Sequence, residues 1–142
     1  MSLRAPPSML ALFALLAAAG APSTSGAAQL VADSPTATSI TGDITIDDRG
    51  IVFGNGQRLD FEGRSDRPFR FFDKTYQAVI HTVRDPGAPV RLLNGYALCG
   101  DAPITYLVTF RWAEDTLLLA FDTPDMPADE QAMCASYTYV DP

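Results

Sequence analysis

The sequence has few of the side chains that build catalytic and metal sites. Among 142 residues it contains one histidine, His81, and two cysteines, Cys99 and Cys134. These three side chains do not supply the four ligands of a structural zinc site. A histidine that acts as a general base needs a nucleophile and an orienting acid, and the chain has no Gly-x-Ser-x-Gly motif that would mark a nucleophile. The sequence therefore indicates no catalytic residue, no metal site and no cofactor.

Positive charge and long apolar runs are also scarce. The chain has ten basic and seventeen acidic residues, a net charge of −7 at pH 7. Because an acidic protein is repelled by nucleic acids and by anionic lipid surfaces, no nucleic-acid partner is expected. The apolar run Met9–Ala19 has eleven residues, whereas a transmembrane helix needs about 20, so this run is too short to span a membrane.

Residues 1–28 have the features of a secretory signal peptide. Arg4 supplies a positive charge, Met9–Ala19 is the apolar region, and Gly26-Ala27-Ala28 fits the small-x-small cleavage pattern. Cleavage at the alternative site, Ala19-Gly20-Ala21, is disfavoured because Pro22 would follow the cut. The remaining chain keeps all seventeen acids and nine bases, a net charge of −8, and we expect no stable membrane insertion after cleavage.

Two cysteines in an exported protein predict a disulfide bond. A bond between Cys99 and Cys134 closes a loop of about 36 residues, for which the chain-entropy model gives about 3.8 kcal/mol of stabilisation. About 114 residues remain after export, a length typical of one small domain. Against a typical net stability of about 5–15 kcal/mol, such a link is important. Two free thiols are the alternative.

From Thr38 onward the pattern is that of β-strands, and no segment has a convincing helical period. Residues 29–37 are small and polar and are predicted to form a flexible leader, which leaves residues 38–142 as a single all-β domain. Short strands at roughly ten-residue spacing predict a compact antiparallel β-sandwich or small barrel of about seven to nine strands. The expected strands cover residues 39–41, 44–46, 51–53, 58–62, 69–72, 76–83, 90–93, 104–112, 116–121 and 135–140.

Some of these segments have a predictable place in the fold. Gly54-Asn55-Gly56 marks a tight hairpin turn, because Asn-Gly readily adopts the positive φ that such turns need. Ile104–Trp112 alternates as a half-buried strand does, whereas Leu117–Phe121 is apolar on both faces and is expected to be central. His81 lies in an alternating strand, and we expect it on the solvent side or hydrogen-bonded at a sheet edge.

A stretch rich in arginine and aromatic residues is the main candidate for a binding site. Arginine among aromatic rings engages anionic sugars, phosphate or a partner's carboxylates. The structural alternative places Phe69 and Phe71 in the core and Arg70 on the wet face of an edge strand. Tyr137 and Tyr139 share a strand face and offer a sugar-stacking platform, for which packing is the alternative. The possible anion or partner patch comprises Arg64, Arg67, Phe69, Arg70, Phe71 and Lys74.

Acidic pairs and an acidic loop are the remaining candidates. A glycosidase needs two carboxylates about 5–10 Å apart in a cleft, and Asp47-Asp48 or Glu114-Asp115 would have to supply them; acids are also common in solvated turns. The loop Asp122–Glu130 lacks the oxygen spacing and central glycine of an EF-hand. A solvated, proline-stiffened loop is favoured over calcium binding there, and a small carboxylate-dependent envelope hydrolase is the enzymatic alternative for the whole chain.

Two segments in the second half of the chain share a pattern with a known group. They are Asn94–Gly100 (NGYALCG) and Cys134–Tyr139 (CASYTY). With these Asn-Gly…Leu-Cys-Gly and Cys-x-x-Tyr-Thr-Tyr elements, the chain resembles small uncharacterised exported proteins of Gram-negative bacteria, for which no activity is known. In size, compartment and fold type it also resembles periplasmic inhibitors of C-type lysozyme, although their inhibitory loop matches no stretch of this sequence.

These observations predict a non-enzymatic β domain in the periplasm or outside the cell. We expect it to act as a binding, inhibitor or envelope accessory protein. Its partner would be an envelope or secreted protein or a glycan.

Overall fold

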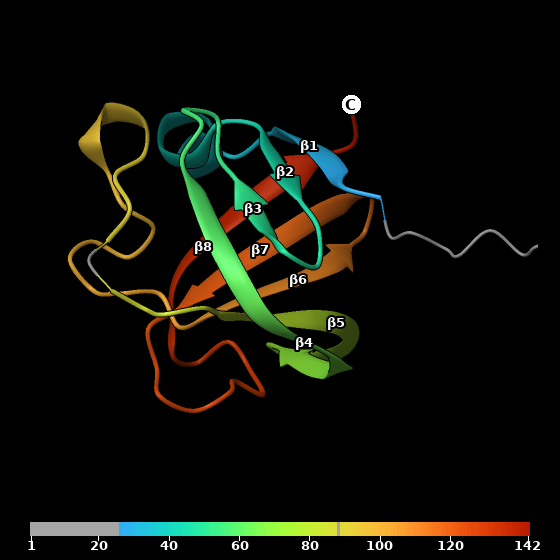
Figure 1. The fold of residues 1–142 in the computed structure, drawn as a ribbon. Coiled ribbons are helices and arrows are strands. Elements are labelled where there is room, and N and C mark those ends of the chain that lie inside the picture. The colour runs from blue at the N-terminus through green and yellow to red at the C-terminus, as the bar shows by residue number, and fades with distance from the viewer. Residues whose placement is uncertain (1–25, 88) are drawn as a thin grey trace, which may run out of the picture.

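The computed structural model describes residues 26–87 and 89–142 and shows a closed antiparallel barrel of eight strands with one disulfide bond (Figure 1). This confirms the predicted all-β fold class. In chain order the elements are β1 (Ala28–Ala32), a single π-helical turn η1 (Ala37–Thr41), β2 (Ile44–Ile46), β3 (Gly50–Val52), β4 (Arg58–Phe71), β5 (Lys74–Val83), a 3-10 turn η2 (Leu93–Gly95), β6 (Tyr106–Trp112), β7 (Asp115–Phe121) and β8 (Met133–Val140).

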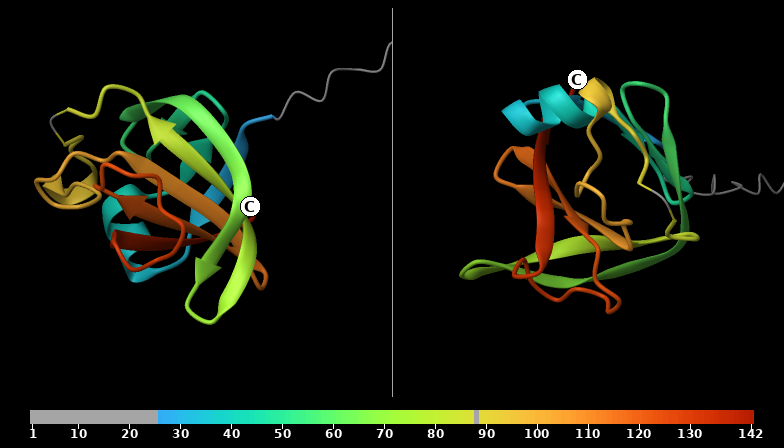
Figure 2. Two further views of the ribbon diagram at one scale, coloured as in Figure 1. Left: turned by 90° about the horizontal axis from the view of Figure 1, so that it is seen from below. Right: turned by 90° about the vertical axis from the view of Figure 1, so that its left-hand side faces the viewer.

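Each strand pairs with its neighbours in sequence, and β1 also pairs with β8 to close the barrel. The predicted hairpin at Gly54-Asn55-Gly56 joins β3 to β4, with Gly56 at φ +85°. β4 is long because the two predicted strands 58–62 and 69–72 form one continuous element. A register shift between Phe61 and Gly63 marks an irregularity in its pairing with β5, and such bulges bend a strand. Figure 2 shows the resulting curve of β4 (green) across the barrel.

Buried side chains form two clusters on the two faces of the sheet. One cluster fills the barrel and draws on all eight strands; the other lies on the opposite face of β5, β6 and β7. Because neighbouring residues of a strand point to opposite faces, Leu107 belongs to the inner cluster and Val108 to the outer one, and both are fully buried. The same geometry explains why Leu117–Phe121 is apolar throughout, which confirms its predicted central place.

The predicted flexible leader over residues 29–37 is wrong. Residues 28–32 form β1, which pairs with β2 on one side and β8 on the other. Leu30 is only 6% exposed and belongs to the inner cluster. This short segment is held as a strand by its pairing with β2 and β8, and that pairing closes the barrel. The predicted signal peptide over residues 1–28 lies almost entirely outside the described residues.

Two further expected strands are absent from the described residues. Residues 39–41 belong to η1, where hydroxyl groups bond carbonyls four residues earlier, as Thr41 Oγ1 does with the Ala37 carbonyl (3.2 Å). Such local bonds compete with strand pairing. Residues 90–93 lie in the long connection from β5 to β6, in whose described residues η2 is the one regular element.

The predicted disulfide is confirmed. Cys99 and Cys134 are joined, with their Cα atoms 5.4 Å apart. The bond ties the connection before β6 to the start of β8. No helix in the part of the chain that the structure describes is both long and apolar enough to cross a bilayer.

Candidate functional site

The predicted basic and aromatic patch is divided by the pleat of β4. Phe69 faces Tyr76 and Phe71 faces Lys74 across the β4–β5 pairing, whereas Arg64 faces His81 on the other side of the sheet. Phe69 is completely buried in the outer cluster. Its place in a partner patch is therefore wrong, and the structural alternative holds for this residue.

Arg64 is occupied by local carboxylates. Its guanidinium donates hydrogen bonds to Asp48 and to Asp66, the latter at 2.9 Å. These bonds raise the pKa of Arg64. Arg67 remains exposed and donates to the Ser65 hydroxyl at 3.0 Å. The six residues of the predicted patch therefore do not form one surface.

An aromatic hollow forms instead where the β4–β5 and β6–β7 hairpins end. Phe71, Phe72, Tyr76 and Trp112 line it together with Asp73 and Lys74, around a volume of about 380 Å³. Phe71 meets Phe72 at a centroid distance of 4.7 Å and an angle of 78°, and it meets Trp112 at 6.3 Å and 76°. The rings around this open hollow therefore lie at steep angles to one another rather than in one plane.

The outermost rings of the aromatic hollow are unusually exposed. Phe72 is 61% exposed and Trp112 is 43% exposed. Phe72 has a φ of +52°, and such values are rare for a bulky side chain. A residue held in this conformation costs about 1–3 kcal/mol, which persists only where the surrounding structure imposes it. The turn therefore presents the ring to solvent at some cost in stability.

The two hairpin ends are braced by hydrogen bonds. The Arg70 Nε donates to the Phe72 carbonyl (3.2 Å), and the Arg70 backbone N–H donates to the Ala128 carbonyl (3.0 Å). In the β6–β7 turn Arg111 donates to the Glu114 carbonyl (2.9 Å). These hydrogen bonds hold the backbone that positions Phe72 and Trp112.

Two charged side chains lie in the lining of the aromatic hollow, Asp73 and Lys74. Lys74 lines the hollow, and Arg70 reaches the Phe72 carbonyl at its edge. Neither cation forms an ion pair within the described residues. Asp73 is the one acid in the lining. The lining therefore carries one cation and one anion, with Lys74 as its cation.

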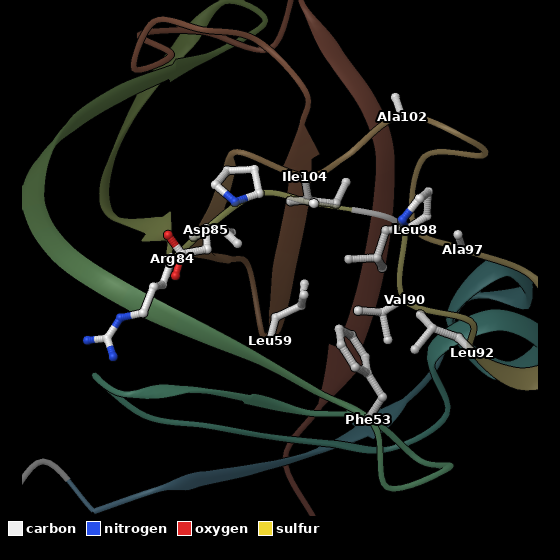
Figure 3. Close-up of a pocket in the computed structure, with 14 residues that line it drawn as sticks. Phe53, Leu59, Arg84, Asp85, Val90, Leu92, Ala97, Leu98, Ala102 and Ile104 are labelled. Atoms are coloured by element: carbon white, nitrogen blue, oxygen red, sulfur yellow. The ribbon is translucent and has the colours of Figure 1, made fainter.

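A second cavity, the barrel-end pocket, lies between the barrel and the β5–β6 connection (Figure 3). Its volume is about 150 Å³. Most of its lining is aliphatic or aromatic, and Arg84 and Asp85 lie along one side of it, with the Arg84 guanidinium pointing away from the apolar side chains. The lining consists of Phe53, Leu59, Val83, Arg84, Asp85, Pro86, Gly87, Pro89, Val90, Leu92, Ala97, Leu98, Ala102 and Ile104.

His81 is buried, so its predicted place on the solvent side or at a hydrogen-bonded edge is wrong. It is 4% exposed and stacks on Phe61 at a centroid distance of 4.3 Å. Its Nδ1 has no hydrogen-bond partner within the described part of the chain. Burial, with a smaller contribution from Arg64, lowers the pKa of His81 to about 4, so the ring is neutral at pH 7.

The tyrosines of β8 are packing residues, as one of the two interpretations held. Tyr137 and Tyr139 are 1% and 0% exposed. Tyr137 donates to the Leu98 carbonyl (2.7 Å), and Tyr139 shares a hydrogen bond of 2.6 Å with Thr41. Burial raises the pKa of Tyr137 to about 12 and raises that of Tyr139 as well. A sugar-stacking platform on this strand is excluded.

Two of the acidic candidates, Asp47 and Asp129, accept backbone hydrogen bonds within turns. Asp47 Oδ1 accepts the backbone N–H groups of Arg49 (2.8 Å) and Gly50 (3.0 Å), which fixes the β2–β3 turn. In the acidic loop, Asp129 Oδ1 accepts the Gln131 N–H (3.0 Å). Within residues 26–87 and 89–142 no three His, Cys, Asp or Glu side chains gather in a way that could hold a metal ion.

The aromatic hollow was not predicted as a unit, although a signal was present. Phe71 and Phe72 are consecutive, and consecutive residues of a strand point to opposite faces, so one ring of such a pair is hard to bury.

Comparison with protein families, curated proteins and solved structures finds no match to this chain.

Proposed function

We propose that this chain is an exported binding protein, of the inhibitor or accessory type, which holds a polypeptide partner through the aromatic hollow. One observation carries the proposal: two braced hairpin ends present Phe72 and Trp112 to solvent around a hollow walled by aromatic rings. Aromatic residues and arginine are enriched among the side chains that dominate the free energy of protein–protein binding.

The shape of the hollow favours a polypeptide over a glycan. A sugar ring stacks on an open aromatic face, but the rings here meet at 68–78° around Phe71. A hollow with such walls suits an inserted apolar side chain. The inserted side chain would be one anchor within a larger contact, because stable interfaces bury about 800 Å² on each partner.

Charge indicates the neighbours of that anchor. Lys74 lines the hollow and forms no ion pair within the described residues. Complementary charge selects partners and speeds their encounter. We therefore expect Asp or Glu next to the anchoring side chain.

Export rests on separate support. The disulfide Cys99–Cys134 is typical of oxidising compartments, and the signal-like residues 1–28 and the resemblance to exported bacterial proteins agree with it. We therefore place the protein in the periplasm or outside the cell, where the partner would be an envelope or secreted protein.

The test is a selection of random twelve-residue peptides displayed on phage against the full exported chain. We expect enrichment of peptides with one aromatic or large aliphatic residue next to Asp or Glu. Synthetic versions should bind Phe72→Ala and Trp112→Ala at least tenfold more weakly than the wild type. Lys74→Glu should remove the preference for acidic neighbours.

Tyr96→Ala is the matched control, because Tyr96 is also an exposed aromatic residue (55%). It follows η2, which Figure 1 shows on the side of the barrel away from the β4–β5 hairpin. Peptides that bind Phe72→Ala as tightly as the wild type would contradict the proposal. Retention of the protein on a glycan array, lost on Trp112→Ala, would assign the surface to sugars and equally overturn it.

A further inference from the structure

We infer that the barrel-end pocket binds a small apolar molecule of about the size of one aromatic ring. This inference is independent of the aromatic hollow, because the two sites share no lining residue. It concerns a separate binding activity, at the end of the barrel that the β5–β6 connection covers.

The lining chemistry suits an apolar ligand. Phe53, Val83, Leu92, Leu98 and Ile104 line the pocket and are all at most 8% exposed. In Figure 3 the labelled apolar side chains surround the space between the barrel and the connecting chain. Ligand sites of this kind are concave and mostly apolar, with a few polar groups that orient the ligand.

One wall of the pocket both packs on the core, through Leu92 and Leu98, and is tied to the fold by polar groups. The β5–β6 connection forms this wall, and polar groups tie it to three separate parts of the fold. Asn55 Nδ2 donates to the Arg91 carbonyl (3.0 Å), and Asn94 Nδ2 donates to the Ser39 carbonyl (2.8 Å). Further along, the Tyr137 hydroxyl donates to the Leu98 carbonyl (2.7 Å).

The disulfide adds a covalent tie next to the last of these bonds, since Cys99 follows Leu98 and Cys134 lies on β8. With these four ties the connection has a fixed position over the apolar barrel end. The ties therefore make the pocket a built feature of the fold.

These ties use the two sequence elements that marked the second half of the chain. Asn94–Gly100 supplies Asn94, Leu98 and Cys99, and Cys134–Tyr139 supplies Cys134 and Tyr137. The elements thus meet in space at the wall of the pocket. Maintaining this wall is the structural task that they share.

Volume sets the size of the ligand. A dry apolar cavity of about 150 Å³ accommodates benzene, and the barrel-end pocket has about this volume. It is too small for a long acyl chain or a fused double ring. Arg84 and Asp85 are exposed and lie at its side, where a polar substituent of the ligand would reach them.

The test uses toluene as the probe and the disulfide-bonded full chain as the protein. Toluene is titrated while the ¹³C-methyl NMR resonances of Leu, Val and Ile are recorded. We expect saturable shifts confined to the methyl groups of the pocket, and no saturable shift with 1-methylnaphthalene, which carries a second ring. Shifts that grow linearly without saturation, or equal binding of the two compounds, would overturn the inference.

Leu59→Trp places a larger side chain in the pocket, since Leu59 lines it and points into it in Figure 3. We expect toluene to bind this variant at least tenfold more weakly, while Ala132→Phe, at an exposed position outside the lining, binds as the wild type does. If Leu59→Trp fails to fold, Ala97→Leu, at another lining position, replaces it. Unchanged toluene affinity in a folded, pocket-filling variant would refute the assignment.

Discussion

Replacing His81 should remove an acid-sensitive contribution to the stability of the barrel. The ring is 4% exposed and stacked on Phe61, and burial lowers its pKa from 6.5 to about 4. The folded protein therefore holds the neutral ring at pH values where the unfolded chain already binds a proton. Linkage between protonation and folding turns this difference into free energy.

The sign and the size of the effect follow from the two pKa values. Above about pH 6.5 the ring is neutral in both states, and its full contribution to stability is present. As the pH falls from 6.5 towards 4, the unfolded state takes up the proton first and stability is lost. The interval between the two values corresponds to about 3 kcal/mol at about 1.4 kcal/mol per pH unit.

Urea denaturation of the wild type and His81→Leu, at intervals between pH 7.5 and pH 4, measures this loss. Leucine has a similar volume and does not titrate, so any packing cost is a constant offset between the two proteins. Surface carboxylates titrate in both proteins and cancel in the comparison. On acidification the wild type should lose about 3 kcal/mol more than the variant. A difference that stays constant across the range would show that His81 is not held neutral by burial.

Three further predictions concern closure of the fold. Replacing both Cys99 and Cys134 with Ser should lower the free energy of unfolding by about 3.8 kcal/mol, measured in urea; equal midpoints with and without the bond would contradict this. Leu30→Ala should lower the free energy of unfolding by about 2–4 kcal/mol and speed amide exchange in β8 as well as in β1. Faster exchange in β1 alone would show that the stability of β8 does not depend on its pairing with β1. Tyr137→Phe removes the hydrogen bond to the Leu98 carbonyl. It should lower the free energy of unfolding by about 1 kcal/mol and weaken toluene binding. Unchanged toluene affinity would show that this bond does not hold the pocket wall in place.

Local sequence patterns predict those parts of this fold that local interactions decide. The alternation of Ile104–Trp112 and the apolar run Leu117–Phe121 place two strands correctly, and Asn55-Gly56 marks a real turn. The disulfide follows from cysteine number and compartment alone. These features depend on a few neighbouring residues or on a covalent partner that the sequence names.

The features that were missed depend on tertiary context. Residues 28–32 form a strand because they pair with β2 on one side and with β8 on the other. Their local sequence alone does not predict this strand. His81 is buried because the β4 irregularity near Phe61 brings an aromatic ring over it. Likewise, the consecutive rings of Phe71 and Phe72 indicate that one of them is exposed, but which one depends on a turn geometry with φ +52° at Phe72. The division of the arginine-rich stretch between two faces follows from the unbroken course of β4.

Closure through β1 and β8 joins positions that are far apart in the chain. Ala32 pairs with Tyr139, 107 positions later, so the barrel closes only when the residues from β1 to β8 are all present. Contacts of such long range slow folding. Before the barrel closes, the sheet has two edge strands whose unpaired backbone N–H and C=O groups can pair with another molecule. The interval before the last strand docks is therefore when this protein is most exposed to self-association, and anything that shortens the interval protects it.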